Sequence, residues 1–271
     1  MSTKTYNTTK YYITGAEVPR ETKSYKPISH GQLIDLTMES IHQAGFVLDS
    51  ESYSSARDGQ IANGRFAIRN VADKEMQLQI GWQNSYDKSL SLKFAIGTRI
   101  FICQNGCVSG DYGAFKKKHE GNVQEFAPAK IVEYIKAAGD AFLKLQKERE
   151  AMKLVEIDRR TTAELVGRMI IEQEFIESTQ LLIIERELKH PTFDYNASGT
   201  LWELYQHTTF AMKEVHPSLW MGNHMAAHEF FVNASGELKG KSINIGFESP
   251  APGNRQLTIF DQLAETATIV E

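Results

Sequence analysis

The residues best suited to bind a charged partner gather between positions 99 and 119. Three lysines and a histidine form the densest basic run of the chain, with aromatic residues close by. Lysine and arginine attract phosphates, and aromatic rings stack on bases. The pattern predicts a nucleic-acid-binding surface, while a solvated loop explains the same charges equally well. The candidate surface comprises Arg99, Asn105, Tyr112, Phe115, Lys116, Lys117, Lys118 and His119.

Glycines and cysteines in this segment allow two further interpretations. Gly97 and Gly106 flank a predicted short strand and would let the backbone approach a phosphate closely. No Walker or GxGxxG motif accompanies them, so we favour a strand bend and a turn. Cys103 and Cys107 are the only cysteines, and no second Cys or His pair completes a zinc pattern. We interpret both as buried thiols.

Two histidines raise the question of a metal. His224 and His228 are four residues apart on a predicted helix, a spacing that can hold a metal ion. The HExxH pattern is not met, because Glu229 lies outside the pair. We therefore predict neither a metal nor another cofactor. No nucleophile motif of the Gly-x-Ser-x-Gly type occurs, so the sequence gives no positive indication of catalysis.

The elements that must position these residues begin with a helix and a series of strands. Ser29 is a predicted N-cap with Gln32 as its capping-box partner, and Gly45 is the predicted stop. Apolar residues then alternate with period two over four or more segments between residues 46 and 103. The connections are too short for crossover helices, which predicts an antiparallel meander.

After Pro128 the apolar spacing becomes helical. A heptad-like seam from Ile131 to Val155 predicts one long helix with Phe142 and Leu145 buried. Two further helices are predicted to begin near Thr161 and Thr200, and a short one is predicted to contain His224 to Phe231.

This order of elements predicts an α+β fold in which an antiparallel β-meander packs against long α-helices. The predicted divisions are a flexible N-terminal arm (1–27), a mixed domain containing the sheet (28–127), a helical region packed on the sheet (128–232), and a hairpin with a loose tail (233–271).

Composition narrows the classes of protein. The formal charge of −4 and the pI near 6.1 exclude a uniformly basic nucleic-acid binder but allow a local basic patch. No apolar run reaches the roughly 18 residues of a membrane span. The N-terminal segment lacks an apolar signal core, and cysteines are few, so we expect a cytoplasmic protein without membrane contact.

Three elements of the stretch 82–119 form a family-like pattern. They are the polar turn Asn84–Ser89, the strand-like Gly97–Asn105 with Arg99 and Cys103, and the basic pair Lys118–His119. This pattern resembles a family of uncharacterised phage- or plasmid-like proteins. Residues 201–205 resemble the family's W-x-L-Y helix, although Gln206 stands where the family usually has Asn. The resemblance implies carriage on a mobile element and supplies no activity.

The order of helix, antiparallel strands and long helix is also similar to that of phage single-strand annealing proteins, which assemble into rings. That likeness concerns the fold alone. The favoured hypothesis is a mobile-element protein that binds nucleic acid; single-stranded DNA is one candidate ligand. The same hypothesis includes assembly into homo-oligomers. The alternative is a protein-interaction module, for example an inhibitor of a host defence factor. A metal-dependent enzyme built on His224 and His228 is a third hypothesis.

Overall fold

The first long helix begins where the sequence places a capping box. In the computed structural model, α2 (His30–Gln43) starts after Ser29, whose Oγ accepts from the backbone N–H of Gln32 while the Gln32 side chain accepts from the backbone of Ser29. Gly45 follows the helix with a φ of +77°, which lets the chain turn into the first long strand. The structure describes residues 6–69, 73–101, 106–108 and 113–243, with 106–108 and 241–243 by their backbone alone.

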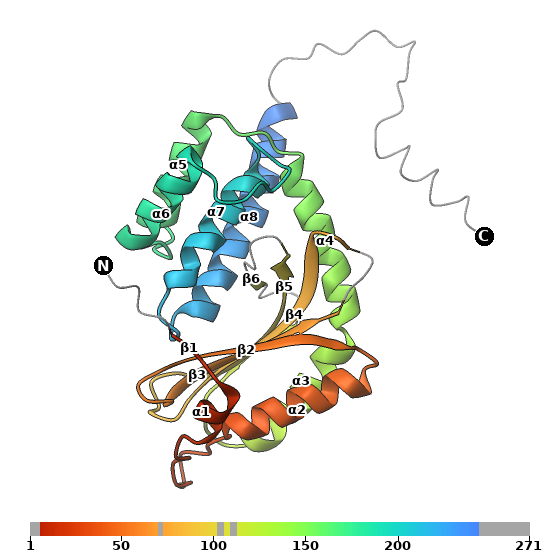
Figure 1. The fold of residues 1–271 in the computed structure, drawn as a ribbon, viewed down its shortest axis with the longest axis vertical. Helices are drawn as coiled ribbons and strands as arrows, with labels where there is room; N and C mark the ends of the chain where they lie inside the picture. Colours follow the sequence, from red (N-terminus) through yellow and green to blue (C-terminus); the bar gives the residue numbers. More distant parts are fainter. Residues whose placement is uncertain (1–5, 70–72, 102–105, 109–112, 244–271) are drawn as a thin grey trace, which may run out of the picture. The chain divides into compact units, whose positions relative to one another are not determined.

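Strands within the described residues form one antiparallel sheet, shown in Figure 1. The strand order is β1-β2-β3-β4-β5-β6. Strand β6 pairs with the end of β5, and β7 pairs with its beginning, along the same edge. This confirms the predicted α+β fold with an antiparallel meander. The strands are β1 (Asn7–Thr8), β2 (Leu48–Ala56), β3 (Ile61–Ile68), β4 (Met76–Ser85), β5 (Leu92–Ile100), β6 (Gly106–Val108) and β7 (Ala114–Lys117).

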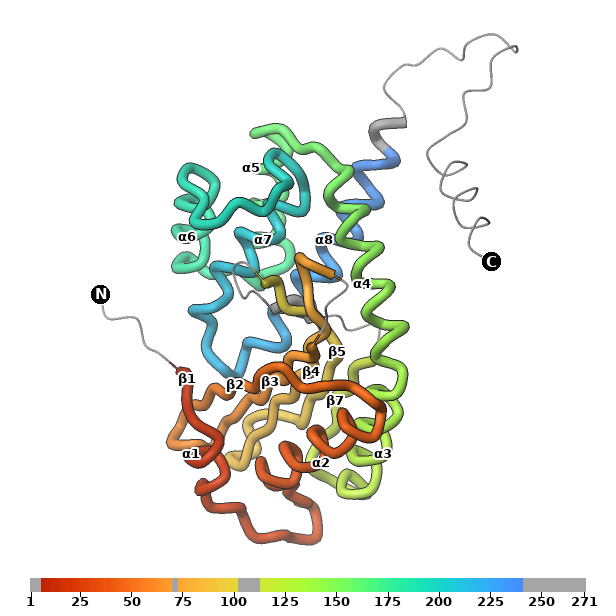
Figure 2. The backbone as a smooth tube through the Cα atoms, turned by 45° about the vertical axis from the view of Figure 1, so that its right-hand side comes forward, coloured from red at the N-terminus to blue at the C-terminus, as the bar shows by residue number. Residues whose placement is uncertain are grey.

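The sheet has one apolar and one polar face, because successive side chains of a strand point to opposite sides. Helices α2 and α3 (Val123–Lys136) lie side by side on the apolar face (Figure 2). There Leu33, Phe66 and Ile131 belong to one buried cluster. The polar face points to the later helices. On it lie Ser50, Ser52, Ser54, Asn63, Arg65, Gln79, Gln83, Lys93 and Arg99 in register across β2–β5.

The prediction of one long helix over the seam is wrong in one respect, because two helices separated at Ala137 form there. Helix α3 begins before Pro128, and α4 (Ala138–Lys153) follows the break. Leu145 is buried as predicted, whereas Phe142 is half-buried against the core cluster. The remaining helices are α5 (Arg159–Ile171), α6 (Ser178–Lys189), α7 (Leu201–Ala211), the 3-10 turn η1 (Met212–Glu214) and α8 (Trp220–Ile243).

Both predicted ends of the chain differ from the structure. Residues 6–27 do not form a loose arm throughout, because β1 pairs with β2 and α1 (Lys10–Thr14) buries Ile13 completely. The hairpin predicted from residue 233 is wrong as far as residue 243, since α8 continues there; the predicted tail lies outside the described residues. The chain divides into two units, Met1–Gly236 and Glu237–Glu271, and the sheet belongs to the first.

Candidate functional site

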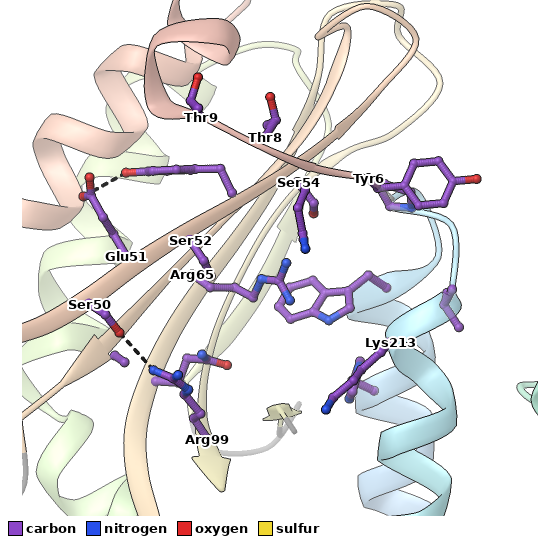
Figure 3. A pocket seen from close by; sticks show the side chains of 18 of the residues that line it. Tyr6, Thr8, Thr9, Ser50, Glu51, Ser52, Ser54, Arg65, Arg99 and Lys213 are labelled. Carbon is purple, nitrogen blue, oxygen red and sulfur yellow. Dashed lines mark hydrogen bonds between the residues drawn. The ribbon is translucent and has the colours of Figure 1, made fainter. Parts of the chain in front are cut away.

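A polar cleft of about 850 Å³ lies between the polar face of the sheet and the segment that joins α7 to α8. The edge strands β1 and β2 supply one wall, β3–β5 the floor, and η1 with the start of α8 the other wall (Figure 3). Small side chains, such as Ser50 and Ser52 of β2 and Ala67 of β3, leave the cleft open. The principal charged and aromatic lining residues are Tyr6, Lys10, Glu51, Arg65, Arg99, Lys213, Glu214, Trp220 and His224.

Two arginines of the floor are the central feature of the cleft. Arg65 on β3 and Arg99 on β5 face the same side of the sheet, because Arg65 pairs with Gly81 and Arg99 with Gln77 in the antiparallel register. Within the described residues neither guanidinium forms an ion pair with a carboxylate. Arg99 Nη1 donates to Ser50 Oγ at 2.9 Å. Two positive charges are thus held on one polar surface.

The environment of Arg65 shows that this arrangement is electrostatically unfavourable without an anion. Its guanidinium carbon lies 5.1 Å from the ring centroid of Trp220, and its Nε is buried with no hydrogen-bond partner. Burial, and after it the charge of Arg99, lowers the pKa of Arg65 to about 10. An anion bound in the cleft would supply the missing negative charge.

The helical wall is fixed to the sheet by two side-chain amides. Asn63 Nδ2 and Gln83 Nε2 both donate to the carbonyl oxygen of Pro217, at 3.1 and 2.5 Å. This anchors the start of α8 over the middle of the sheet, where Trp220 contacts Gly81 closely. Lys213 of η1 also lines the cleft (Figure 3), with its Nζ 4.5 Å from the centroid of the Phe210 ring. The wall is therefore held at a set distance from the arginines.

Carboxylates are also present at the rim. Glu51 accepts a hydrogen bond from the Tyr53 hydroxyl at 2.9 Å, and the exposed Glu214 follows Lys213 on η1. Four basic residues line the cleft, but Lys10 Nζ lies 3.7 Å from Met38 Sδ and Lys213 Nζ lies 4.5 Å from the centroid of the Phe210 ring. The positive charge on the floor of the cleft therefore comes from Arg65 and Arg99. The cleft thus suits an anionic ligand better than a cationic one.

The predicted basic surface is divided by strand β7. Lys116 pairs with Lys93 on the polar face, whereas Lys117 points to the other side and lies 5.0 Å over the Phe126 ring. Phe115 is part of the apolar layer and stacks on Phe94 with ring centroids 5.8 Å apart. Alternation along the strand separates residues that are adjacent in sequence.

The remaining predicted residues lie apart from one another. Lys118 is exposed, whereas the His119 ring is buried near Tyr25, and burial lowers its pKa. Asn105 and Tyr112 lie outside the described residues, as does Cys103; Cys107 is described by its backbone alone. Of the predicted residues that the structure describes, Arg99 alone lines the cleft.

The two histidines considered as metal ligands have different surroundings. His228 Nε2 lies 3.0 Å from Glu148 Oε2, and its Nδ1 lies 3.1 Å from the Tyr205 hydroxyl. His224 packs beside Trp220 and lines the cleft. Among the side chains that the structure describes, no three His, Cys, Asp or Glu residues gather as a metal site would require. The absence of a metal stays a prediction.

Arg65 and Lys213 escaped the sequence reasoning because neither belongs to a charged run. A signal for Arg65 was present: Asn63, Arg65 and Ala67 are the polar or small alternate positions of an otherwise apolar strand. Lys213 is brought to the cleft by the packing of η1, which no local pattern indicates.

Comparison with known proteins identifies the family. Residues 20–229 match the model described as domain of unknown function DUF932. The chain belongs to this family. The predicted resemblance to an uncharacterised family is thereby confirmed and extends well beyond residues 82–119. No curated protein and no solved structure matches the chain. Among the described residues, no helix combines the length and apolar character that crossing a bilayer requires.

Proposed function

We propose that this DUF932 protein binds nucleic acid as a single strand, with the phosphate backbone in the cleft. The observation that carries the proposal is the pair Arg65 and Arg99, two guanidinium groups on one polar surface with no carboxylate partner among the described residues. Arginine is the side chain best suited to phosphate, because its planar group donates two parallel hydrogen bonds.

The form of the cleft favours a flexible strand. Its volume of about 850 Å³ lies within the roughly 300–1,000 Å³ typical of ligand pockets. Such a space accepts a few nucleotides in an extended conformation and excludes a stiff duplex. The half-buried ring of Tyr6 stands at the rim and offers a surface on which a base can stack.

Two further parts of the proposal rest on other grounds. Carriage on a phage, prophage or plasmid rests on the family-like pattern of residues 82–119. Assembly into homo-oligomers rests on the fold-level likeness to annealing proteins.

A salt titration tests the binding directly. Fluorescence anisotropy of a labelled oligothymidylate of about 15 nucleotides gives the dissociation constant at several salt concentrations. Each lost phosphate contact on a single strand lowers the salt slope by about 0.7, which is a factor of about five in affinity near 0.1 M salt. We expect Arg99→Ala to show this change.

The control is Arg160→Ala, which removes the same charge from an exposed position on α5 outside the cleft. It should leave the salt slope unchanged. A wild-type protein that binds no oligonucleotide at low salt would refute the proposal and favour the protein-interaction alternative. If Arg99→Ala and Arg160→Ala changed the salt slope equally, the cleft would not be the binding site.

A further inference from the structure

A second like-charge pair lies on the same polar face as the cleft. Lys93 of β5 and Lys116 of β7 are directly opposite each other in the antiparallel register. Like charges in this relation destabilise a sheet. Neither lysine forms an ion pair with any described residue, and burial together with Lys116 lowers the pKa of Lys93. An anion that contacts both would relieve the repulsion.

The start of α8 separates this lysine pair from the arginines. Trp220 and Met221 pack on Ala95, which lies on the polar face between Lys93 and Gly97. Lys93 lies on the side of that contact away from Arg99. Its Nζ is close to Gly222 of α8, where an added Cβ would be 3.5 Å from it. The cleft with Arg99 is on the near side.

The longest distance between the two pairs runs along strand β5. Lys93 and Arg99 are six residues apart on that strand, so their backbones are separated by about 20 Å at roughly 3.3 Å per residue. Arg65, opposite Gly81, is nearer to Lys93, which is opposite Gln83. A mononucleotide is too short to touch Lys93 and Arg99 together. A chain that touches both must also pass around the start of α8.

We infer that the ligand is a strand of several nucleotides that contacts the Arg65–Arg99 pair and the Lys93–Lys116 pair at once, bending around the start of α8. The inference rests on the proposed function and specifies its ligand. The bend requires a flexible chain. Double-stranded DNA has a persistence length of about 500 Å and does not bend over about 20 Å without a large energetic penalty. The lysine pair thus makes the protein select long single strands over short ones and over duplexes.

Length-dependent binding tests the inference. The double variant Lys93→Ala/Lys116→Ala is compared with wild type on oligothymidylates of about 4 and about 15 nucleotides and on a duplex of about 15 base pairs. We expect the double variant to lose about 25-fold in affinity for the long strand near 0.1 M salt, with a salt slope lower by about 1.4. Its affinity for the short strand should match that of wild type.

The matched control is Lys130→Ala/Lys189→Ala, which removes two lysines that pair with glutamates on their own helices, away from the polar face. It should behave as wild type. Because Lys93 is half-buried, the single variant Lys116→Ala, at an exposed position, repeats the test with a loss of about five-fold. Melting curves show that each variant is folded.

The outcomes separate the inference from the proposed function. Binding of both oligonucleotides, with the long strand unaffected by the lysine substitutions, would overturn the inference and leave the cleft as the binding site. Binding of neither oligonucleotide by wild type would overturn both. A duplex bound as tightly as the long single strand would also contradict the inference.

Discussion

The contact between Gly64 and Trp82 fixes the register that turns Arg65 into the cleft. Gly64 on β3 is directly opposite Trp82 on β4, whose ring is fully buried. A Cβ at position 64 would lie 2.5 Å from Trp82 Cε2, whereas ordinary contacts begin at 3.4 Å. The ring would therefore have to move by about 0.9 Å within a packed core.

We expect Gly64→Ala to lower the free energy of unfolding by about 3 kcal/mol, at the upper end of typical overpacking. The gain in strand propensity, at most about 1 kcal/mol, offsets little of this. For a chain of this size, about 2–4 °C per kcal/mol translates the loss into a melting temperature lower by roughly 6–12 °C. Far-UV circular dichroism during heating measures it.

The matched change is Gly167→Ala in the interior of α5, where an added Cβ meets nothing within 4 Å. It should raise the free energy of unfolding by up to about 1 kcal/mol. The same chemical change thus has opposite signs at the two positions. A Gly64→Ala variant as stable as wild type would refute the register of β3 and β4, and with it the placement of Arg65 on the floor of the cleft.

Two further predictions concern the core. His30 is fully buried; its Nδ1 and Nε2 pair with Asn84 Nδ2 and Gly59 O, which suits the neutral ring, and burial lowers its pKa from 6.5 to about 4. The unfolded chain binds this proton first, so the stabilisation is complete above pH 6.5 and is lost as the pH falls towards 4, by about 3 kcal/mol. Urea unfolding at pH 7 and pH 4.5 should show a smaller loss for His30→Gln than for wild type, and equal losses would contradict the assignment. Leu145→Ala should cost about 2–5 kcal/mol, whereas Leu143→Ala, at a position that is 57% exposed, should cost less than about 0.5 kcal/mol; similar urea midpoints for the two variants would show that α4 faces the core differently.

Local patterns in the sequence were sufficient for much of the fold. The capping box at Ser29, the N-cap at Thr200 and the period-two alternation of the strands each act over a few residues, so the sequence alone determines them. Alternation also determines that the sheet has one polar face. The predicted long helix was wrong at Ala137, because apolar spacing continues across a break that only packing produces.

The candidate site depended on contacts distant in sequence. The run Lys116–His119 reads as one basic tip, yet strand pairing sends Lys116 and Lys117 to opposite faces and packing buries His119. Arg65 belongs to no charged run, and Arg99 was predicted only as part of the surface between residues 99 and 119. The two line one cleft because β3, β4 and β5 pair in one register. The sequence determines which face each side chain of a strand occupies, since that depends on the backbone alone. Which charges lie together, and what covers them, is decided by tertiary structure, because it depends on strand pairing and on the position of α8.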